Sequence, residues 1–372
     1  MATDQAPAQA RLPSDSQQPS VGVIVFHDDL RTTVGLAGEA DRAGVHTVWT
    51  GEFYFRSGSV PLAAMAATTR QCRVGSSILY RVGRSPVVLA AEARDLDELS
   101  QGRFVLGLGN GTRRMLRDWH GGDPSAPAVR MEELLELLDK LWRIHEGPVE
   151  HDGRFYRVNI VPTAAVPTPL RPRIPVFIAA ANPRMIEVAG RAADGVIGHG
   201  LWTPDYVRDV VRPSIARGAD RRDRSPADVE VSALVIASVH DDEEQARREV
   251  AALIAFYARV KAYQPMLALA GYAAEGAAVV NAVGRGDLPA AQDAVTDRMI
   301  DDIAVAGTFE QVRDRLRRYS GVLDHVILQS PSMVIGPERA AENVRSLIAV
   351  AGQNVRVDAA PAAAATSWPW SR

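Results

Sequence analysis

Short apolar, β-branched runs alternate with longer segments of helical periodicity along most of the chain. The runs cover Val21–Phe26, Thr47–Thr50, Arg73–Leu79, Arg103–Leu108, Val176–Ala180, Val196–Ile197, Val229–Val239 and Asp324–Leu328. A repeated β–α unit requires a parallel sheet, either open and doubly wound or closed into a barrel. Eight units favour closure. The sequence therefore predicts an α/β fold of the (β/α)8 barrel type, the TIM barrel, with an open Rossmann-like sheet as the alternative.

Two stretches interrupt this alternation and define the domain organisation. Residues 147–175 are rich in proline and lack helical period, and residues 261–294 also read as irregular. They predict insertions after strands 4 and 7. Residues 1–19 and 352–372 are polar or rich in alanine and proline, so we expect a disordered leader and a disordered tail around a single barrel domain at 20–351.

Composition excludes several classes of partner. The net charge is −3, so no basic field invites nucleic acid. Cys72 is the single cysteine, which excludes an internal disulfide and fits a reducing cytoplasm. No apolar run is long enough for a membrane span, and the first residues lack the apolar core of a signal peptide. We expect a cytoplasmic protein that acts on a small molecule and binds neither nucleic acid nor membrane.

In a (β/α)8 barrel the chemistry lies on the loops that follow the strands. The strand ends of this chain are rich in glycine and aromatic residues, and they contain no cluster of His, Asp or Glu with metal-ligand spacing. No metal is expected. Gly107, Gly109 and Gly111 would let a flat ligand approach the backbone, although a tight turn is an alternative explanation. Asn182 begins a helix whose N-terminus could bind a phosphate, or it could be only a helix cap.

Four segments in order resemble luciferase-like monooxygenases and coenzyme F420-dependent reductases. They are residues 41–52, 101–111, 175–197 and 307–328, and the resemblance spans about residues 21–350. It implies a barrel, a dimer, and a cofactor ring lying across the strand ends. The cofactor implied is F420, with FMN as the alternative. Under FMN the same site would activate oxygen, as in a monooxygenase.

The resemblance also implies roles for individual residues. Ser76, Ser77 and Ile78 would form a strand 3 bulge, often with a non-prolyl cis bond, that supports the ring. The other cofactor-contacting positions would be Glu52, Asn110, Gly111, Ala179, Ala180, Ala181 and Asn182. The chain departs from the sugar-phosphate dehydrogenases of the family at Phe53 and Thr112, where those enzymes have a histidine and an acid. Oxidation of sugar phosphates is therefore not expected.

The working hypothesis is that reduced F420 delivers hydride to a C=C or C=N bond of a small metabolite. Glu52, His27 and His199 are the candidates for the accompanying proton, although Glu52 could instead hold the ring or an arginine, and His27 could be solvated. Tyr54, Tyr80 and Trp202 would wall the substrate, or belong to the core. Arg81, Arg113 and Arg114 could bind the acidic tail of the cofactor. A non-catalytic cofactor carrier on the same barrel is a further alternative.

Overall fold

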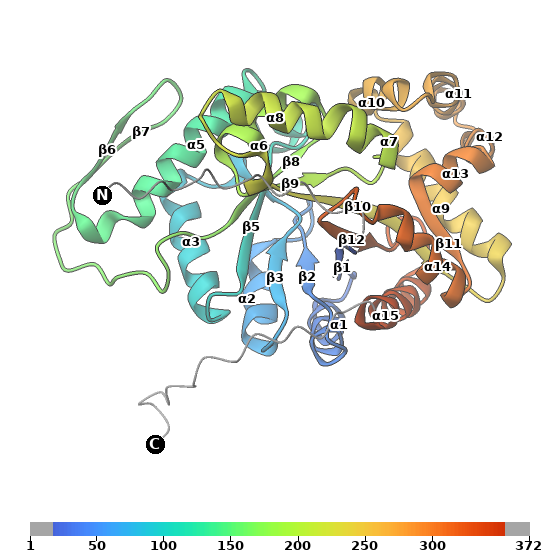
Figure 1. The fold of residues 1–372 in the computed structure, drawn as a ribbon, viewed down its shortest axis with the longest axis horizontal. Coiled ribbons are helices and arrows are strands. Elements are labelled where there is room, and N and C mark those ends of the chain that lie inside the picture. The colour runs from blue at the N-terminus through green and yellow to red at the C-terminus, as the bar shows by residue number, and fades with distance from the viewer. Residues whose placement is uncertain (1–17, 354–372) are drawn as a thin grey trace, which may run out of the picture.

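A computed structural model describes residues 18–353, and its centre is a closed barrel of eight parallel strands (Figure 1). The strands are β1 Ser20–Ile24, β2 Thr47–Thr50, β3 Arg73–Ser76, β5 Phe104–Gly109, β8 Val176–Ala180, β9 Gly195–Gly198, β10 Glu230–Val239 and β12 His325–Gln329. The barrel closes because β1 pairs with both β2 and β12. A short strand, β4 Leu79–Tyr80, extends the line of β3 and pairs with β5. The predicted barrel and its eight strands are confirmed.

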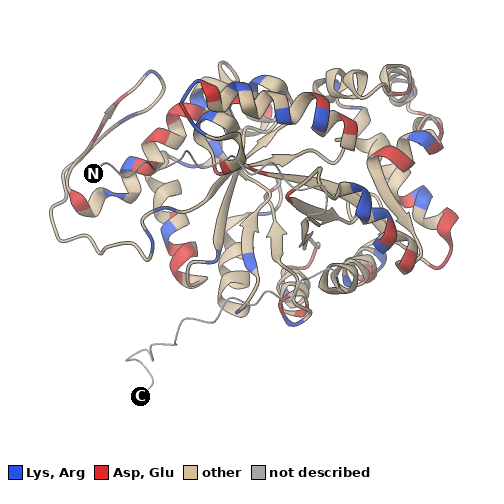
Figure 2. Ribbon diagram, in the orientation of Figure 1, with Lys and Arg blue, Asp and Glu red and all other residues tan. Residues whose placement is uncertain are grey.

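Helices surround the barrel and carry most of the charged side chains, whereas the strands are largely uncharged (Figure 2). The main helices are α1 Leu30–Arg42, α2 Ser59–Thr68, α3 Pro86–Leu99, α5 Pro127–Trp142, α6 Pro183–Ala192, α8 Arg212–Asp220, α9 Glu243–Ala258, α14 Phe309–Arg315 and α15 Pro337–Gln353. Side-chain caps start many of them, among them Asp29, Ser85 and Asn182. Thr308 and Gln311 form a capping box at α14.

The two insertions are more regular than the sequence indicates. Residues after α5 form an antiparallel hairpin of β6 Val149–Asp152 and β7 Arg157–Ile160, which stands beside α5 in Figure 1. Residues after α9 form α10 Gln264–Leu269, α11 Ala273–Gly284 and α12 Leu288–Asp293. The prediction of irregular structure was wrong at both places. Proline-rich flanks obscure the short hairpin, and the alanine-rich helices show little apolar periodicity because alanine lies on all their faces.

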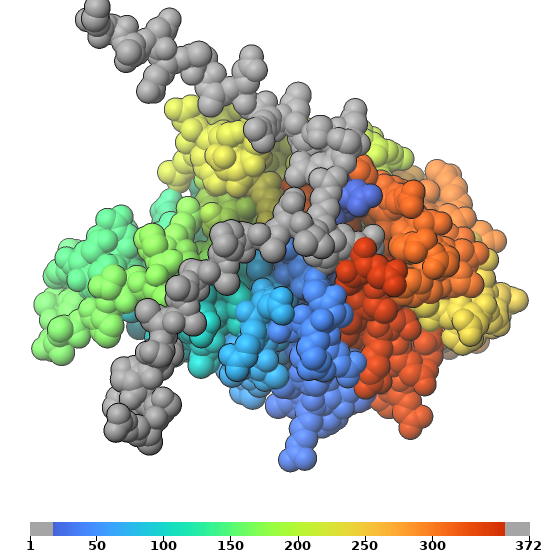
Figure 3. Space-filling model, turned by 60° about the horizontal axis from the view of Figure 1, so that its bottom comes forward, coloured from blue at the N-terminus to red at the C-terminus, as the bar shows by residue number. Residues whose placement is uncertain are grey.

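Three further elements escaped the sequence analysis: α4 Arg113–His120, α13 Asp297–Ile303 and β11 Ala304–Gly307, which adds to β10 in parallel. Figure 3 shows the hairpin segment and the helical insertion on opposite flanks of the molecule. Residues 1–17 of the predicted leader and residues 354–372 of the predicted tail lie outside the described residues, and residues 352–353 belong to α15. Within residues 18–353 no helix has the length and apolar character that a membrane span needs.

The interior of the barrel is filled by one compact cluster below the strand ends. Trp49, Val105, Phe177, Ile197 and Ile327 form it, and each is at most 3% exposed. A Cβ atom built at Gly75 would overlap the Trp49 ring, so glycine on β3 makes room for this indole. Because the lower barrel is solid, open space inside it lies only toward the carboxyl ends of the strands.

A buried histidine, His325, and a half-buried one, His46, lie at the opposite, amino-terminal end of the barrel. His325 accepts a hydrogen bond from Trp49 Nε1 at 3.1 Å, so its Nδ1 carries the hydrogen and donates to Ser20 Oγ at 2.7 Å. Burial, together with His46 and Arg73 nearby, holds the pKa of His325 well below its usual value of 6.5. Burial, with Arg73, lowers the pKa of His46 to about 4. Both side chains are therefore neutral in the native protein at neutral pH.

Acid should weaken the fold through His325. Below pH 6.5 the unfolded chain protonates this histidine and the native protein does not, so its contribution is complete above that pH and is lost as the pH falls. The expected slope is about 1.4 kcal/mol per pH unit for one such group. Urea unfolding of His325→Gln between neutral pH and pH 5 should show a slope smaller by that amount. The same substitution at exposed His120 should leave the slope unchanged, and equal slopes in both variants would contradict the assignment.

Candidate active site

The carboxyl ends of β3, β5 and β8 form an apolar surface at the mouth of the barrel. Ile78 and Ala179 point inward and are partly exposed, whereas Val105 below them is buried. Gly109 lies between them, and a Cβ built there would overlap Ile78 Cδ1. Ile24 and Leu234 continue the apolar surface and are also partly exposed. We call Ile78, Gly109 and Ala179 the floor of the mouth.

The backbone next to this floor has the bulge that the family resemblance implies. The Ser77–Ile78 peptide bond is cis, as expected. Ser77 N donates to Thr50 O at 2.7 Å, which joins the bulge to β2. Ser76 behaves differently from the prediction. Its fully buried hydroxyl donates to Gly107 O and accepts from Gly107 N at 2.8 and 2.7 Å, so it links β3 to β5 and does not face the mouth.

Glu52 is held in an ion pair. Its carboxylate contacts Arg84 Nη2 at 2.9 Å and accepts a hydrogen bond from Tyr80 N at 2.6 Å. The side chains of Glu52 and Arg84 are only 10% and 11% exposed. Arg84 also pairs with Glu92 at 2.5 Å. The carboxylate therefore connects the loop after β2 to the segment after β4.

The ring of His27 also has both nitrogens engaged. Its Nδ1 accepts from Asp29 N at 3.0 Å, which leaves the hydrogen on Nε2, and Nε2 donates to Pro337 O at 3.2 Å. The ring thus joins the loop after β1 to the start of α15. Neither nitrogen is free to reach a ligand while these bonds persist.

His199 faces a group of aromatic side chains on the other side of the mouth. Its ring centroid lies 4.7 Å from that of Tyr257 and 4.1 Å from that of Tyr263. Its Nδ1 accepts from Leu201 N at 3.2 Å, so Nε2 carries the hydrogen. Burial lowers the pKa of His199 to about 3. At neutral pH the side chain is a neutral hydrogen-bond donor.

Gln329 stands beside this aromatic group at the end of β12. Its Nε2 donates to Tyr257 OH at 2.7 Å, and its Oε1 is buried with no hydrogen-bond partner among the described residues. A Cβ at Gly200 would lie 3.2 Å from that oxygen, so glycine keeps the space beside it open. His199 and Gln329 therefore offer one donor and one unsatisfied acceptor.

Asn110 and Gly111 directly follow β5. Asn110 Oδ1 accepts a hydrogen bond from Arg81 Nε, and Gly111 is exposed with φ of +67°, a conformation that favours glycine. Ala181 and Asn182 directly follow β8, the neighbouring strand of the barrel. Asn182 caps α6 by accepting from Met185 N at 3.1 Å, while Ala180 is buried and Ala181 is partly exposed. The positive end of the α6 dipole lies at this turn.

The three predicted substrate residues lie in different environments. Tyr54 is 70% exposed and packs edge to face with Phe55 and Trp119 on the rim. Tyr80 is 7% exposed, with its ring near that of His120. Trp202 is 2% exposed and packs against Tyr206 in the outer core, where Gly198 makes room for it. The prediction that Trp202 walls a substrate was wrong.

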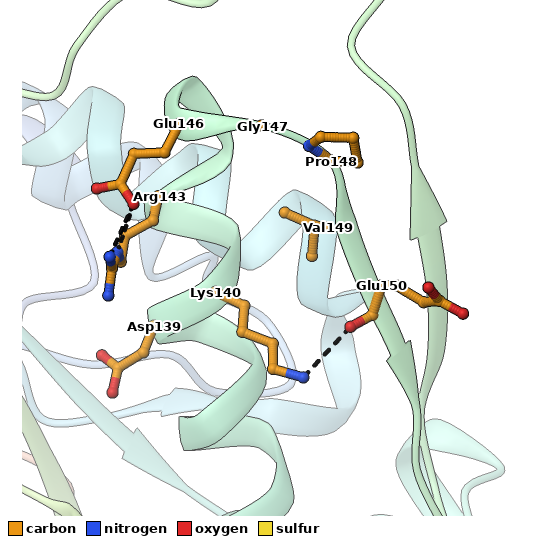
Figure 4. Close-up of a pocket in the computed structure, with 8 residues that line it drawn as sticks. All are labelled: Asp139, Lys140, Arg143, Glu146, Gly147, Pro148, Val149 and Glu150. Carbon is orange, nitrogen blue, oxygen red and sulfur yellow. Dashed lines mark hydrogen bonds and ion pairs between the residues drawn. The ribbon is translucent and has the colours of Figure 1, made fainter.

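A separate groove lies outside the barrel. It encloses about 610 Å³ between the end of α5 and the hairpin, and is lined by Asp139, Lys140, Arg143, Glu146, Gly147, Pro148, Val149 and Glu150 (Figure 4). Arg143 pairs with Glu146 at 2.7 Å, and Lys140 donates to Glu150 O at 3.2 Å. In residues 18–353 no group of three or more His, Cys, Asp or Glu suits a metal ion.

Sequence reasoning missed the aromatic group and Gln329. Tyr257 lies at the end of α9 and Tyr263 in the insertion that follows, far along the chain from the strand end that carries His199. Gln329 directly follows a predicted strand, so its position could have identified it as a candidate site residue. Nothing in the sequence indicates that the residues after α9 fold back over the mouth.

Comparison with known proteins gives a consistent family. A family model described as luciferase-like monooxygenase matches residues 6–325. A putative coenzyme F420-dependent oxidoreductase of Mycobacterium tuberculosis is 25% identical, with 85% of this chain and 93% of that protein covered. The 5,10-methylenetetrahydromethanopterin reductase of Methanopyrus kandleri is 26% identical, with 86% and 94% covered. The structure of the F420-dependent tetrahydromethanopterin reductase from that organism aligns with a TM-score of 0.75 and 25% identity, covering 91% of this chain and 99% of that one.

The floor should not tolerate a side chain at Gly109. Gly109→Ala would place a methyl group onto Ile78, so we expect a loss of about 1–3 kcal/mol of unfolding free energy from overpacking. Gly35→Ala is the matched control, because nothing lies within 4 Å of a Cβ on this exposed position of α1. It should stabilise the protein by up to about 1 kcal/mol. Urea unfolding measures both, and a Gly109→Ala protein as stable as the wild type would contradict the described floor.

Proposed function

Because the chain belongs to the luciferase-like monooxygenase family, we propose that it is a coenzyme F420-dependent oxidoreductase that reduces a C=C or C=N bond of a small metabolite. The observation that carries this proposal is the floor of Ile78, Gly109 and Ala179 at the mouth of the barrel. An apolar surface made by three adjacent strand ends, with a glycine at its centre, suits the face of a planar ring. The F420 dependence named for one relative of nearly full length and for the aligned reductase structure supports this cofactor over FMN.

The residues at the ends of β3, β5 and β8 fit such a cofactor. Ser77 and Ile78 would support one face of the ring, and Asn110 and Gly111 would lie at its edge. The cofactor phosphate would bind at Ala180, Ala181 and Asn182, where the N-terminus of α6 favours an anion. When bound, the cofactor supplies the hydride, and the chain supplies orientation, shielding from water and polarisation.

His199 is the group we assign to the substrate among the three proton-transfer candidates. With a pKa of about 3 it does not carry a proton to give at neutral pH, but its Nε2–H can donate a hydrogen bond to a substrate nitrogen or oxygen. Such a bond polarises a double bond toward hydride addition, and the proton that completes the reduction would come from water at the mouth. Gln329 Oε1 beside it would accept a hydrogen bond from the same substrate.

Glu52 and His27 have positioning roles in this proposal. The Glu52 carboxylate is occupied by Arg84 and by Tyr80 N, and both nitrogens of His27 are occupied by backbone groups. Tyr54 and its aromatic neighbours would meet an apolar part of the substrate at the rim, and Tyr80 would pack beneath them.

We also propose a homodimer and a cytoplasmic location. Val60, Val87 and Val88 are 57%, 40% and 48% exposed on the neighbouring helices α2 and α3. Exposed apolar residues gathered on two adjacent helices suit burial against a second copy of the same chain. The cytoplasmic location rests on the single, buried cysteine.

Cofactor titration tests the proposal directly. Purified protein should quench the fluorescence of F420 on binding, and FMN added at the same concentration should not displace it. The reduced cofactor should then be consumed in the presence of cyclohexenone or a cyclic imine, which are simple probes of C=C and C=N reduction. Binding of FMN without binding of F420 would overturn the cofactor assignment and favour the monooxygenase. Tight F420 binding without turnover of any probe would favour a carrier.

Substitution of His199 separates the three candidates. His199→Phe keeps a buried ring and removes the donor, so kcat should fall on the order of 10²-fold, as when one preorganised donor is removed. His27→Gln, the matched histidine control, should change kcat by less than about threefold because it acts only on loop position. Since the pKa of His199 is about 3, its loss should not alter the pH profile between pH 5 and 9. A profile inflection that disappears in His199→Phe would show that it transfers a proton.

A further inference from the structure

Arg81 is a buried cation without a counter-ion. It is 6% exposed, and among residues 18–353 no carboxylate forms an ion pair with it. Its Nη2 is buried and has no hydrogen-bond partner there. Its remaining contacts are neutral oxygens: Nε donates to Asn110 Oδ1, and Nη1 donates to Tyr156 OH at 3.3 Å. A guanidinium removed from water without an anion is strongly unfavourable, so this geometry lacks one partner.

The hairpin insertion helps to hold Arg81 in this position. Tyr156 lies at the hairpin tip, where Glu133 of α5 accepts hydrogen bonds from Phe155 N at 2.9 Å and from Tyr156 N at 2.8 Å. The Arg130 guanidinium lies 4.1 Å from the centroid of the Phe155 ring. The hairpin is therefore fixed to α5, and its tip supplies the hydroxyl that meets Arg81. This gives the insertion after strand 4 a role at the mouth.

The neighbours of Arg81 are the segments assigned to the cofactor ring. Arg81 follows Ser77 and Ile78 in the same short segment after β3, and its Nε is bonded to Asn110. The proposed phosphate turn lies beyond Asn110, whose amide is 3.9 Å from Met185 Sδ in the first turn of α6. Arg81 thus stands at the ring end of the proposed site, and Asn110 lies between it and the phosphate end.

We propose that Arg81, held by Asn110 and Tyr156, is the counter-ion for the negative charge that the cofactor ring gains on reduction. The inference rests on the proposed function, because it requires the ring at this end of the mouth. Reduction adds one hydride to the ring, which is two electrons and one proton, and so adds one unit of negative charge. A fixed cation beside the ring stabilises the reduced form more than the oxidised form.

The test compares the affinity for oxidised and reduced F420 in the same protein. In Arg81→Met the Kd for reduced F420 should rise about tenfold more than the Kd for oxidised F420. A tenfold change in that ratio corresponds to a reduction potential of the bound cofactor lower by about 30 mV. In Arg81→Lys the ratio of the Kd for reduced F420 to the Kd for oxidised F420 should rise less than in Arg81→Met, because lysine keeps the charge and loses only the planar fork. Both affinities are measured anaerobically by titration, without any substrate.

Two control variants give the comparison its meaning. Arg117→Met removes a guanidinium from the neighbouring α4, where Arg117 is 70% exposed and paired with Asp118 at 2.7 Å, and it should leave the ratio unchanged. Tyr156→Phe removes only the hydroxyl and should raise the Kd for reduced F420, relative to that for oxidised F420, less than Arg81→Met does. Thermal melts show whether Arg81→Met keeps the fold. If it does not, Arg81→Lys and Tyr156→Phe carry the test.

Each other outcome is decisive. An equal loss of affinity for both redox forms would show that Arg81 binds a constant charge such as the phosphate, and would overturn the inference. Unchanged affinities would assign Arg81 to the substrate or to the fold, with the same consequence. Failure of the wild-type protein to bind F420 in either form would instead sink the proposed function. In that case the oxidised-to-reduced comparison is made with FMN, whose ring also gains negative charge on reduction.

Discussion

Hydrogen bonding between the first and last strands of the barrel is the constraint on which the rest of the structure depends. Ser20 to Val23 of β1 lie in register with His325 to Leu328 of β12, and this pairing brings residues some 300 positions apart to one rim. Closure turns every inward side chain toward a shared axis. The large Trp49 ring lies inside the barrel, and it fits there because Gly22 and Gly75 have no side chains that would overlap it. The filled lower barrel then leaves the strand ends as the place where a ligand can enter.

The charges around the mouth follow from this arrangement. Side chains near the rim have little access to water, so most ionic groups there are paired, as Glu52 is with Arg84. His199 avoids the same cost by remaining neutral among tyrosines. Arg81 is the exception, since its guanidinium has neither solvent nor a carboxylate nearby among the described residues. A site that is otherwise neutral gives one fixed charge a large influence on any ligand whose own charge changes.

The sequence predicts the barrel well because buried parallel strands leave a strong signal. Most strands are short apolar runs that contain Val or Ile, and several helices are bounded by Pro, Ser, Asn or Thr at their first turn, as at Pro86 and Asn182. The insertions were not predicted as hairpin and helices, since neither packs an apolar stripe against the barrel in the way that α3 does. Among the site residues, the cis bond at Ser77–Ile78 was predicted from the family resemblance, because hydrophobic periodicity carries no information about peptide-bond geometry.

Errors in the predicted site share one physical origin: a sequence does not tell which way a residue at a strand end faces. Ser76 and Trp202 lie next to inward residues, and each turns away from the mouth, Ser76 toward Gly107 and Trp202 into the outer core. Ser77, directly after Ser76, and His199, three residues before Trp202, lie at the opening instead. Because strand side chains alternate, a displacement of a single position exchanges a ligand contact for a core contact.

The two sides of the mouth have complementary chemistry, and this division limits what the site can do. The ends of β3, β5 and β8 present apolar atoms and glycines. The ends of β9 and β12 present the N–H of His199 and the amide oxygen of Gln329 among tyrosine rings. A planar molecule on the first side would place its face toward the polar pair on the second. Between the two sides a substrate can be polarised by a neutral donor and kept from bulk water without any titrating group. Hydride transfer has those requirements, since it moves charge between two ligands and needs the protein mainly to hold and polarise them.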